Sequence, residues 1–466
     1  MSTFTRFGRS ALRSANATLA LFLLVAAGMA QENSGKILGT VTDSTGGVIP
    51  NAKITAVGST TPRGIETTSD ANGNYQFPNL PIGVYTVTVA AAGFQSVKQA
   101  DVRVQLGSEI SFNPKLAVGQ VSETVEVSAQ AVSLDTTSSR TATNITQSQF
   151  ENYAHGRNFN SILALAPGVR QEVKSGNAGV GGISVDGASG SENSYVLDGV
   201  DVSDVRRGSL RSFNAIPFEF VQEIQVKSGG FEAEYGGATG GVVNVATRSG
   251  TNDFHGQLDF ALTNNQLNAG DRGYWQRSPL NADAADFFRP KEDKYRVFYP
   301  GATVGGPILK NRLFFLGSYH PELQRTERSA NFTGAGPRTY TQEIINHYAL
   351  ARVDYNPVSK LQLNTSYIWS PQRVQGYLPN RDTRVPPPSN DLSIQGGYTP
   401  SQAYTASATY TATSRLVFTG RYGYKYLNDK GGLTGGNYGI SGLPYITYLT
   451  ASSAVKGPVV PADVAG

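Results

Sequence analysis

The chain has no cysteine and little charge for its length. Its 466 residues include 0 Cys and 2 Met, and charged residues make up only 16%. The absence of Cys excludes a disulfide framework, a thiolate zinc site and a cysteine nucleophile. The formal net charge is only +4, and no block of Lys or Arg occurs. Nucleic-acid binding therefore receives no support.

Histidine is also scarce, and no arrangement typical of a catalytic site occurs. None of the four histidines has metal-ligand spacing to a neighbour: His155, His255, His320 and His347. The glycine run at 179–182 does not lie between a strand and a long helix, as a nucleotide-binding loop would. No Ser lies in a nucleophile elbow. The sequence therefore predicts no catalytic residue, no metal and no cofactor, and the protein is not expected to be an enzyme.

Glycine and tyrosine are abundant, with 52 Gly and 23 Tyr. Gly suits tight turns and close backbone approach. Tyr suits interfaces, because its ring is apolar while its hydroxyl can stay in water. The length is typical of about two to four domains.

The first 30 residues are typical of a secretory signal. Three arginines precede the apolar run 19–27, and Gly28-Met29-Ala30 provides small residues for cleavage after Ala30. The alternative is a membrane anchor, but the run is too short to cross a bilayer as a helix, and no other stretch is long enough. If the mature protein enters a membrane, we expect it to do so as a closed β-barrel.

From about residue 254 the sequence alternates between apolar and polar side chains. Apolar residues share one face and polar residues the other: Phe254, Leu258, Phe260 and Leu262 against His255, Gln257, Asp259 and Thr263. A strand needs this pattern when lipid lies on one side and water on the other. Similar alternation predicts strands at 254–263, 295–305, 312–320, 346–356, 360–370, 402–411 and 415–426.

The fourth and fifth of these strands show the two faces most clearly. The predicted lipid-facing residues are Ala349, Ala351, Val353, Tyr355, Leu361, Leu363, Tyr367 and Trp369. The predicted lumen-facing residues are Leu350, Arg352, Asp354, Gln362, Asn364 and Ser366. Aromatic residues near strand ends are expected to form an interfacial girdle: Tyr355, Trp369, Tyr404, Tyr424 and Tyr426.

The connections between the predicted strands alternate in length. The segments 356–359 and 411–414 are short, whereas 264–294, 321–345 and 371–401 are long and polar. Short periplasmic turns and long external loops are the expected asymmetry of an outer-membrane barrel. The alternation predicts that the first strand begins on the periplasmic side.

Residues 37–116 predict a small antiparallel β-sandwich, because short alternating strands are separated by turn signals. The string GTVTDSTGGVIPNAKITAV, with TSDANGNYQFPNLPIGVYTVTVAAAGF after it, resembles the carboxypeptidase regulatory-like domain, a transthyretin-like sandwich. The resemblance implies a non-catalytic accessory module with a carbohydrate-binding-like fold.

A short alternating strand follows, formed by Glu123, Thr124, Val125, Glu126 and Val127. It resembles a TonB box, the extended peptide that an energy-coupling protein grips in the periplasm. Such a strand can add to a partner's sheet edge through main-chain hydrogen bonds. The alternative is that it is the first strand of the next domain; its position in the chain favours the TonB box.

The next segment, 133–250, combines two short predicted helices, near 148–150 and 158–165, with glycine-punctuated strands. The stretches YVLDGVDV and FEFVQEIQVKSGGFEAEYGGATGGVVNVATRSGTNDFHG closely resemble the plug domain of TonB-dependent receptors of the Oar-like branch, and GGPILKNRLFFLGSY resembles the barrel of that branch. The residues of the plug motif are Asp186, Asp198, Gly199, Asp201, Gly229, Gly236 and Gly240. Its three acids are expected to be solvated turn residues, with a calcium or catalytic role as the alternative.

The expected fold is mainly β: an amino-terminal transthyretin-like β-sandwich, an α+β plug domain, and part of an antiparallel transmembrane β-barrel. The expected division is a signal peptide at 1–30, the sandwich at 35–118, the TonB box and linker at 119–130, the plug at 131–250, and the first strands and loops of an incomplete barrel at 251–466. Seven strands is an odd number, and the largest single-chain transporters have about 22. We therefore expect the sequence to be truncated at its carboxyl end.

The resemblance implies a TonB-dependent outer-membrane receptor that takes up a substrate into the periplasm, with its amino-terminal domains periplasmic. Its expected partners are a TonB-type energy-coupling complex, outer-membrane lipid, and an unidentified substrate such as an iron chelate, an oligosaccharide or a peptide, with no nucleic acid. Two alternatives stay open: an outer-membrane adhesin or glycan-binding surface protein, and a non-functional fragment of a transporter.

Overall fold

The computed structural model describes most of the chain between residues 34 and 428. The exceptions are 120–123, 128–140, 154–158, 173–181, 204–216, 232–234, 236, 271, 279–280, 282, 333–335, 382–391 and 394; two later strand segments, 445–449 and 454–458, are also described. The predicted signal segment, Glu123 and Gly236 lie outside the described residues.

The amino-terminal part is the predicted β-sandwich. A three-stranded sheet in the order β5-β1-β8 packs against a five-stranded sheet in the order β10-β7-β6-β3-β4. Alternate side chains point into a shared apolar core, including Ile37, Phe77, Tyr85 and Val87. The strands are β1 Ser34–Thr40, β2 Thr42–Asp43, β3 Lys53–Gly58, β4 Thr61–Thr68, β5 Asn74–Pro81, β6 Gly83–Ala90, β7 Ser96–Val104, β8 Glu109–Ser111 and β9 Lys115–Leu116.

Strand β10, Thr124–Val127, joins the sheet of the sandwich. It pairs in parallel with β7 and forms the edge of the five-stranded sheet. The described residues of the predicted TonB box are therefore not part of the plug sheet. They extend the sandwich instead.

The plug region, residues 141–247, has its own five-stranded sheet in the order β11-β16-β17-β14-β15, with two short helices packed against it. Thr146 begins α2 with a capping box, in which its backbone N–H donates to Gln149 Oε1 at 2.8 Å. The elements are β11 Thr141–Thr146, α2 Gln147–Asn152, α3 Phe159–Leu163, β12 Val169–Gln171, β13 Ile183–Val185, η1 Gly190–Glu192, β14 Ser194–Leu197, β15 Val200–Asp201, η3 Phe218–Phe220, β16 Val221–Gly229 and β17 Val242–Thr247. Both helices lie where the sequence predicts them.

The last part is a long antiparallel sheet, which we call the long sheet. Seven of its strands pair in chain order, and in the described residues β18 and β30 each have one partner, so the sheet is open. These strands are β18 His255–Asn264, β21 Lys294–Leu309, β22 Leu313–Tyr319, β25 Ala349–Val358, β26 Leu361–Trp369, β29 Ser401–Thr413 and β30 Leu416–Leu427. All seven predicted strands are present, with ends shifted by a few residues. Two more strands, β31 Tyr445–Leu449 and β32 Ala454–Pro458, pair only with each other.

The two faces of the long sheet agree with the predicted alternation. Phe254, Leu258, Phe260 and Tyr404 are exposed on one face, whereas Leu350 is buried on the other. The same division holds for the predicted girdle, in which Tyr355, Tyr424 and Tyr426 are exposed. Among the described residues, no helix is long and apolar enough to cross a membrane.

The three long polar segments that the sequence predicts as external loops contain regular structure that the sequence did not predict. The three polar segments contain the paired strands β19 Tyr274–Arg277, β20 Ala285–Phe288, β23 Glu322–Phe332, β24 Gly336–Asn346, β27 Gln372–Gln375 and β28 Gly396–Thr399. Most of them prolong the membrane strands: β22 runs into β23, and β24 runs into β25. Proline lies at several of these breaks because it cannot donate to the ladder. Backbone hydrogen bonds nevertheless continue across them, as from His320 N to Tyr348 O at 2.9 Å and from Ser370 N to Ser401 O at 2.9 Å.

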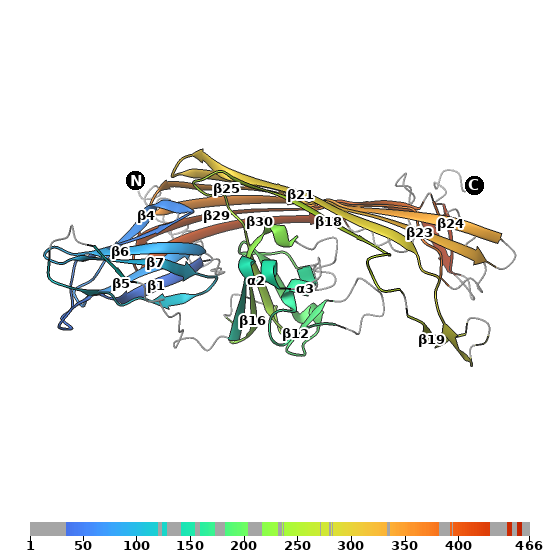
Figure 1. The fold of residues 1–466 in the computed structure, drawn as a ribbon, viewed down its shortest axis with the longest axis horizontal. Helices are drawn as coiled ribbons and strands as arrows, with labels where there is room; N and C mark the ends of the chain where they lie inside the picture. Colours follow the sequence, from blue (N-terminus) through green and yellow to red (C-terminus); the bar gives the residue numbers. More distant parts are fainter. Residues whose placement is uncertain are drawn as a thin grey trace, which may run out of the picture.

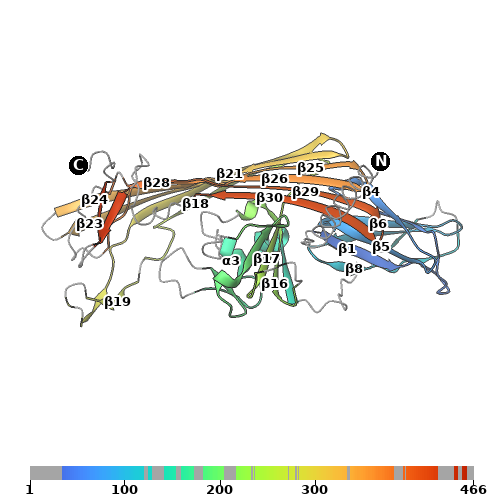
Figure 2. The ribbon, with the colours of Figure 1, turned by 180° about the vertical axis from the view of Figure 1, so that it is seen from behind.

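The sandwich and the plug region lie on the same face of the long sheet (Figure 1). The sandwich is at the end where the short turns are, and the long hairpins β23–β24 extend from the opposite end. The view from behind shows the same order, with the plug region between the sandwich and the hairpins (Figure 2).

If the exposed face of the long sheet contacts lipid, the free-energy cost of placing a charge on it depends on the depth of the position in the membrane. Ala408 is exposed near the middle of β29, and Leu416 is exposed beside a short turn. We expect Ala408→Arg to destabilise the sheet in lipid by about 2–4 kcal/mol and Leu416→Arg by about 0–1 kcal/mol, because the cost of a charge falls toward the interface. Urea unfolding in lipid vesicles measures both; equal losses would contradict a membrane-facing surface.

Candidate functional site

A tight turn in the plug region presents an acid to the long sheet. Strands β14 and β15 pair through Leu197 and Val200, which leaves Asp198 and Gly199 as a two-residue hairpin turn. Both have positive φ, 47° and 81°, as the favoured hairpin turns require. Asp198 is only 6% exposed. Its carboxylate accepts hydrogen bonds from Thr247 N at 2.9 Å and Thr247 Oγ1 at 2.8 Å.

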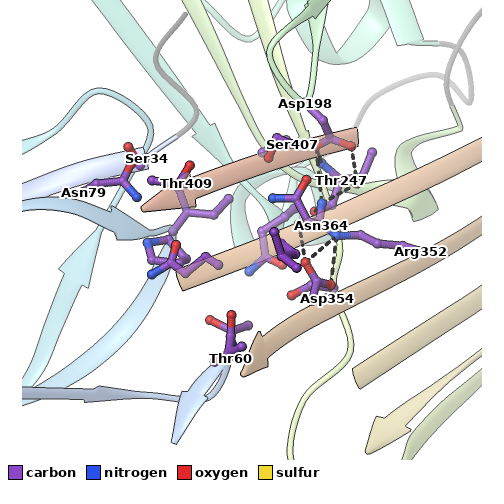
Figure 3. Close-up of a pocket in the computed structure, with 18 residues that line it drawn as sticks. Ser34, Thr60, Asn79, Asp198, Thr247, Arg352, Asp354, Asn364, Ser407 and Thr409 are labelled. Carbon is purple, nitrogen blue, oxygen red and sulfur yellow. Dashed lines mark hydrogen bonds and ion pairs between the residues drawn. The ribbon is translucent and has the colours of Figure 1, made fainter. Parts of the chain in front are cut away.

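Arg352 of the long sheet meets this acid. Its Nη1 lies 3.3 Å from Asp198 Oδ1 and donates to Thr247 Oγ1 at 2.7 Å, while Nη2 lies 2.9 Å from Asp354 Oδ1 (Figure 3). Ser366 Oγ donates to Asp198 Oδ2 at 3.2 Å. We call these five residues the Asp198–Arg352 cluster. Asp198, Thr247, Arg352 and Asp354 line a cavity of about 70 Å³ at the junction of plug region, long sheet and sandwich.

Apolar packing accompanies these polar contacts. Leu316, Tyr348, Leu350 and Ile368 of the long sheet belong to the same buried cluster as the core of the plug region. An apolar patch and the adjacent buried ion pair therefore hold the plug region against the long sheet.

Close backbone approach completes the contact with β30. A Cβ at Gly423 would lie 2.1 Å from Val200 Cγ1, and a Cβ at Gly199 would lie 3.0 Å from Arg421 Nε. Lys425 Nζ also donates to Val202 O. Glycine is thus required at Gly423 for β15 to reach the sheet.

A second polar contact joins the sandwich to the plug region. The Leu106 backbone, just beyond β7, donates from N to Glu223 Oε1 at 3.0 Å and accepts at O from Asn144 Nδ2 at 3.0 Å and Gln225 Nε2 at 2.6 Å. Asn144 Nδ2 also donates to Glu223 Oε1 at 2.6 Å. We call this the Leu106 contact. Burial raises the pKa of Glu223 to about 7, although these hydrogen bonds partly oppose the shift.

The sandwich also contacts the short turns of the long sheet. Asn356 Nδ2 donates to Thr60 O at 2.9 Å, and Arg63 Nη1 donates to Pro357 O at 2.9 Å. Gln76 Nε2 donates to Ser414 O. These contacts hold the sandwich at the end of the sheet where the first strand, β18, begins.

The predicted plug-motif residues lie in different environments in the structure. Asp186 and Asp201 are exposed and Asp198 is buried, so the expectation of three solvated turn acids is wrong for Asp198. The reason is that its turn inserts against Arg352. In the part of the chain that is described, no group of three or more His, Asp or Glu is placed to hold a metal.

The glycines of the motif have separate structural roles. Gly229 ends β16, and Gly240 donates its N–H to Glu192 O at 2.9 Å. A Cβ at Gly240 would lie 2.6 Å from Asn193 Oδ1.

Sequence reasoning missed several residues of these contacts. Arg352 was predicted to face the lumen, but its partner on the plug region was not; Asn144, Glu223 and Leu106 were not singled out at all. The sequence offered one signal for Arg352, because a charged side chain on the predicted lumen face of a strand needs a partner. Nothing in the sequence marks a backbone group such as that of Leu106.

Known protein families match the same three parts of the chain: the sandwich, the plug region and the start of the long sheet. Family profiles match the carboxypeptidase regulatory-like domain over residues 36–117, the TonB-dependent receptor plug domain over 133–242 and an outer membrane beta barrel domain over 246–342. The TonB-dependent transporter Oar of Myxococcus xanthus is 31% identical over 326 residues, which cover 66% of this chain and 29% of that protein.

The chain contains, in this order, a carboxypeptidase regulatory-like domain, a TonB-dependent receptor plug domain and an outer membrane beta barrel domain. It is similar to the Oar-like branch and spans about 29% of the length of the relative that it matches. The family domains assign the receptor to the outer membrane.

Two solved structures are similar to parts of this chain. The siderophore receptor PirA from Acinetobacter baumannii is 19% identical with a TM-score of 0.40, over 58% of this chain and 37% of that one. The outer membrane transporter YddB from Escherichia coli is 14% identical with a TM-score of 0.43, over 61% of this chain and 39% of that one.

The Asp198–Arg352 cluster predicts a large loss of stability when its cation is removed. Arg352→Met leaves two buried carboxylates without a partner charge, so we expect a loss of about 3–5 kcal/mol in unfolding free energy. Arg325→Met is the matched control, since Arg325 is 42% exposed in its ion pairs with Glu327 and Glu343; we expect it to cost less than about 1 kcal/mol. Chemical unfolding of the receptor in detergent distinguishes them, and equal losses would refute a buried plug–sheet ion pair.

The Leu106 contact predicts a pH dependence. The folded-state pKa of Glu223, about 7, lies above its usual 4.5, so folding takes up a proton. Stability is then highest at low pH and falls by up to roughly 3 kcal/mol as pH rises from about 4.5 to 7. We expect Glu223→Gln to remove this dependence, whereas Glu151→Gln on an exposed part of α2 should keep it. Thermal unfolding between pH 4.5 and 8 is the measurement; an unchanged slope in Glu223→Gln contradicts the assignment.

Proposed function

We propose that this receptor takes up a substrate across the outer membrane by a TonB-dependent mechanism. The observation that carries the proposal is the seating of the plug region on the lumen face of the long sheet by the Asp198–Arg352 cluster. A plug in this place blocks passage along the sheet. Transport then requires that these contacts open.

The proposed route begins at the long hairpins. Their lumen-side polar groups form a chain of hydrogen bonds: Asn346 Nδ2 donates to Glu322 Oε2 at 3.0 Å, and Gln372 Nε2 donates to Asn346 Oδ1 at 2.7 Å. Arg328 and Arg381 share the carboxylate of Asp293 at 2.7 and 3.0 Å. Such ordered polar groups suit a polar substrate, and an iron chelate, an oligosaccharide and a peptide all fit that description.

The proposed coupling element is the strand at 123–127. An energy-coupling protein would bind it by strand addition and pull on the chain between the sandwich and the plug region. The division at 35–118, 119–130, 131–250 and 251–466 and the plug-motif residues are parts of this proposal.

The contacts of the sandwich favour transport over adhesion. Thr60, Arg63 and Gln76 contact the short turns of the sheet, which are periplasmic in this proposal. A sandwich on that side would not meet glycans of another cell. The carbohydrate-binding role of the sandwich stays a prediction, for which periplasmic glycan fragments are the relevant ligands.

The coupling strand gives a direct test. Val125→Pro removes a backbone donor from the strand, so we expect at least a tenfold loss of affinity for the purified periplasmic domain of the host's TonB-type protein. Val125→Thr keeps a β-branched residue and should bind within twofold of the unaltered receptor. Binding is measured with the full chain in detergent, and an unchanged affinity for Val125→Pro would refute coupling through this strand.

A further inference from the structure

The coupling strand already has a partner within the chain. Thr124, Val125, Glu126 and Val127 lie opposite Ser96, Val97, Lys98 and Gln99 of β7 in a continuous parallel register. Strand β10 forms the edge of that sheet, next to β7 and then β6. The sandwich therefore uses the edge of β7 to hold the segment that an energy-coupling protein would bind.

This pairing is short and of the less stable kind. It spans four residues, and parallel pairs are slightly weaker per residue than antiparallel ones. Strand addition by a partner uses the same main-chain N–H and C=O groups. A strand held this way is ordered at rest and can still be exchanged.

The edge of β7 is itself fixed in the receptor. Leu106, two residues beyond the end of β7, is held by Glu223, Asn144 and Gln225 of the plug region. The other side of the sandwich is held by the short turns of the long sheet through Thr60 and Arg63. The position of β10 is thus defined relative to both the plug and the sheet.

We propose that the β7 edge of the sandwich is a binding site for the coupling strand of the same chain, which it withholds from the energy-coupling protein until the strand is released. This inference rests on the proposed function of residues 123–127. It gives the sandwich a role within the receptor that does not require a glycan.

The backbone register defines which positions of the two strands are opposed. Lys98 of β7 pairs with Glu126 of β10. The same register also makes the two positions suitable for a disulfide, because adjacent strands lie about 4.8 Å apart and disulfides join Cα atoms about 4.4–6.8 Å apart.

A reversible cross-link tests the proposal in the full chain. Since the chain has no Cys, Lys98→Cys with Glu126→Cys introduces a single disulfide. We expect the oxidised form to bind the purified periplasmic domain of the TonB-type protein at least tenfold more weakly than the reduced form. Lys53→Cys with Thr68→Cys joins β3 to β4 in the same sheet and is the matched control, with equal affinity in both redox states. Equal affinity of the oxidised and reduced β7–β10 cross-link would overturn the proposal.

A free peptide of residues 119–130 separates the coupling function of the strand from its site on the sandwich. If this peptide does not bind the periplasmic domain, coupling through 123–127 is wrong. Hydrogen exchange still decides the site on the sandwich: slow exchange at 124–127 in the unaltered chain supports it, and exchange at the rate of an unstructured peptide overturns it.

Discussion

A strand that exposes apolar side chains on one face leaves its polar and charged side chains on the other face, where they need partners, and this constraint organises the contacts of the long sheet. Side chains such as Arg352 and Ser366 alternate with exposed apolar ones because the period of a strand is two. A charge on the inner face is stable only if it is paired, since burying an isolated ion costs several kcal/mol. The plug region supplies Asp198 for this purpose, and its apolar core covers Leu350 and its neighbours.

The contacts between the three parts differ from the packing within each part. The sandwich and the plug region each have an apolar core formed by alternating strand residues. Between the parts, side chains bind backbone groups, as Gln225 binds Leu106 and Arg63 binds Pro357. Such contacts set a definite geometry but can be exchanged for water at low cost, because a hydrogen bond contributes only about 0.5–1.5 kcal/mol net. In the proposed transport mechanism, these parts must separate.

Periodicity and turn residues predict the strands and their faces well, because both are local properties. The side-chain alternation from Phe254 onward predicts which residues lie on the exposed apolar face, and the structure agrees at Phe254, Leu258 and Phe260. The outer hairpins were missed because most side chains of β23 and β24 are polar, so no apolar face alternates along their sequence. The burial of Asp198 and the attachment of Thr124–Val127 to β7 depend on contacts between residues far apart in the chain. Local sequence patterns do not predict such contacts.

The outer hairpins set how far the receptor reaches from the bilayer. Strands β23 and β24 have 11 residues each, and at about 3.4 Å per residue they are roughly 37 Å long. Each is hydrogen-bonded to the other over its full length, so the hairpin is stiff where a loop of equal length would collapse onto the surface. A molecule that approaches from this end of the sheet meets the rigid rim well before it meets the plug region.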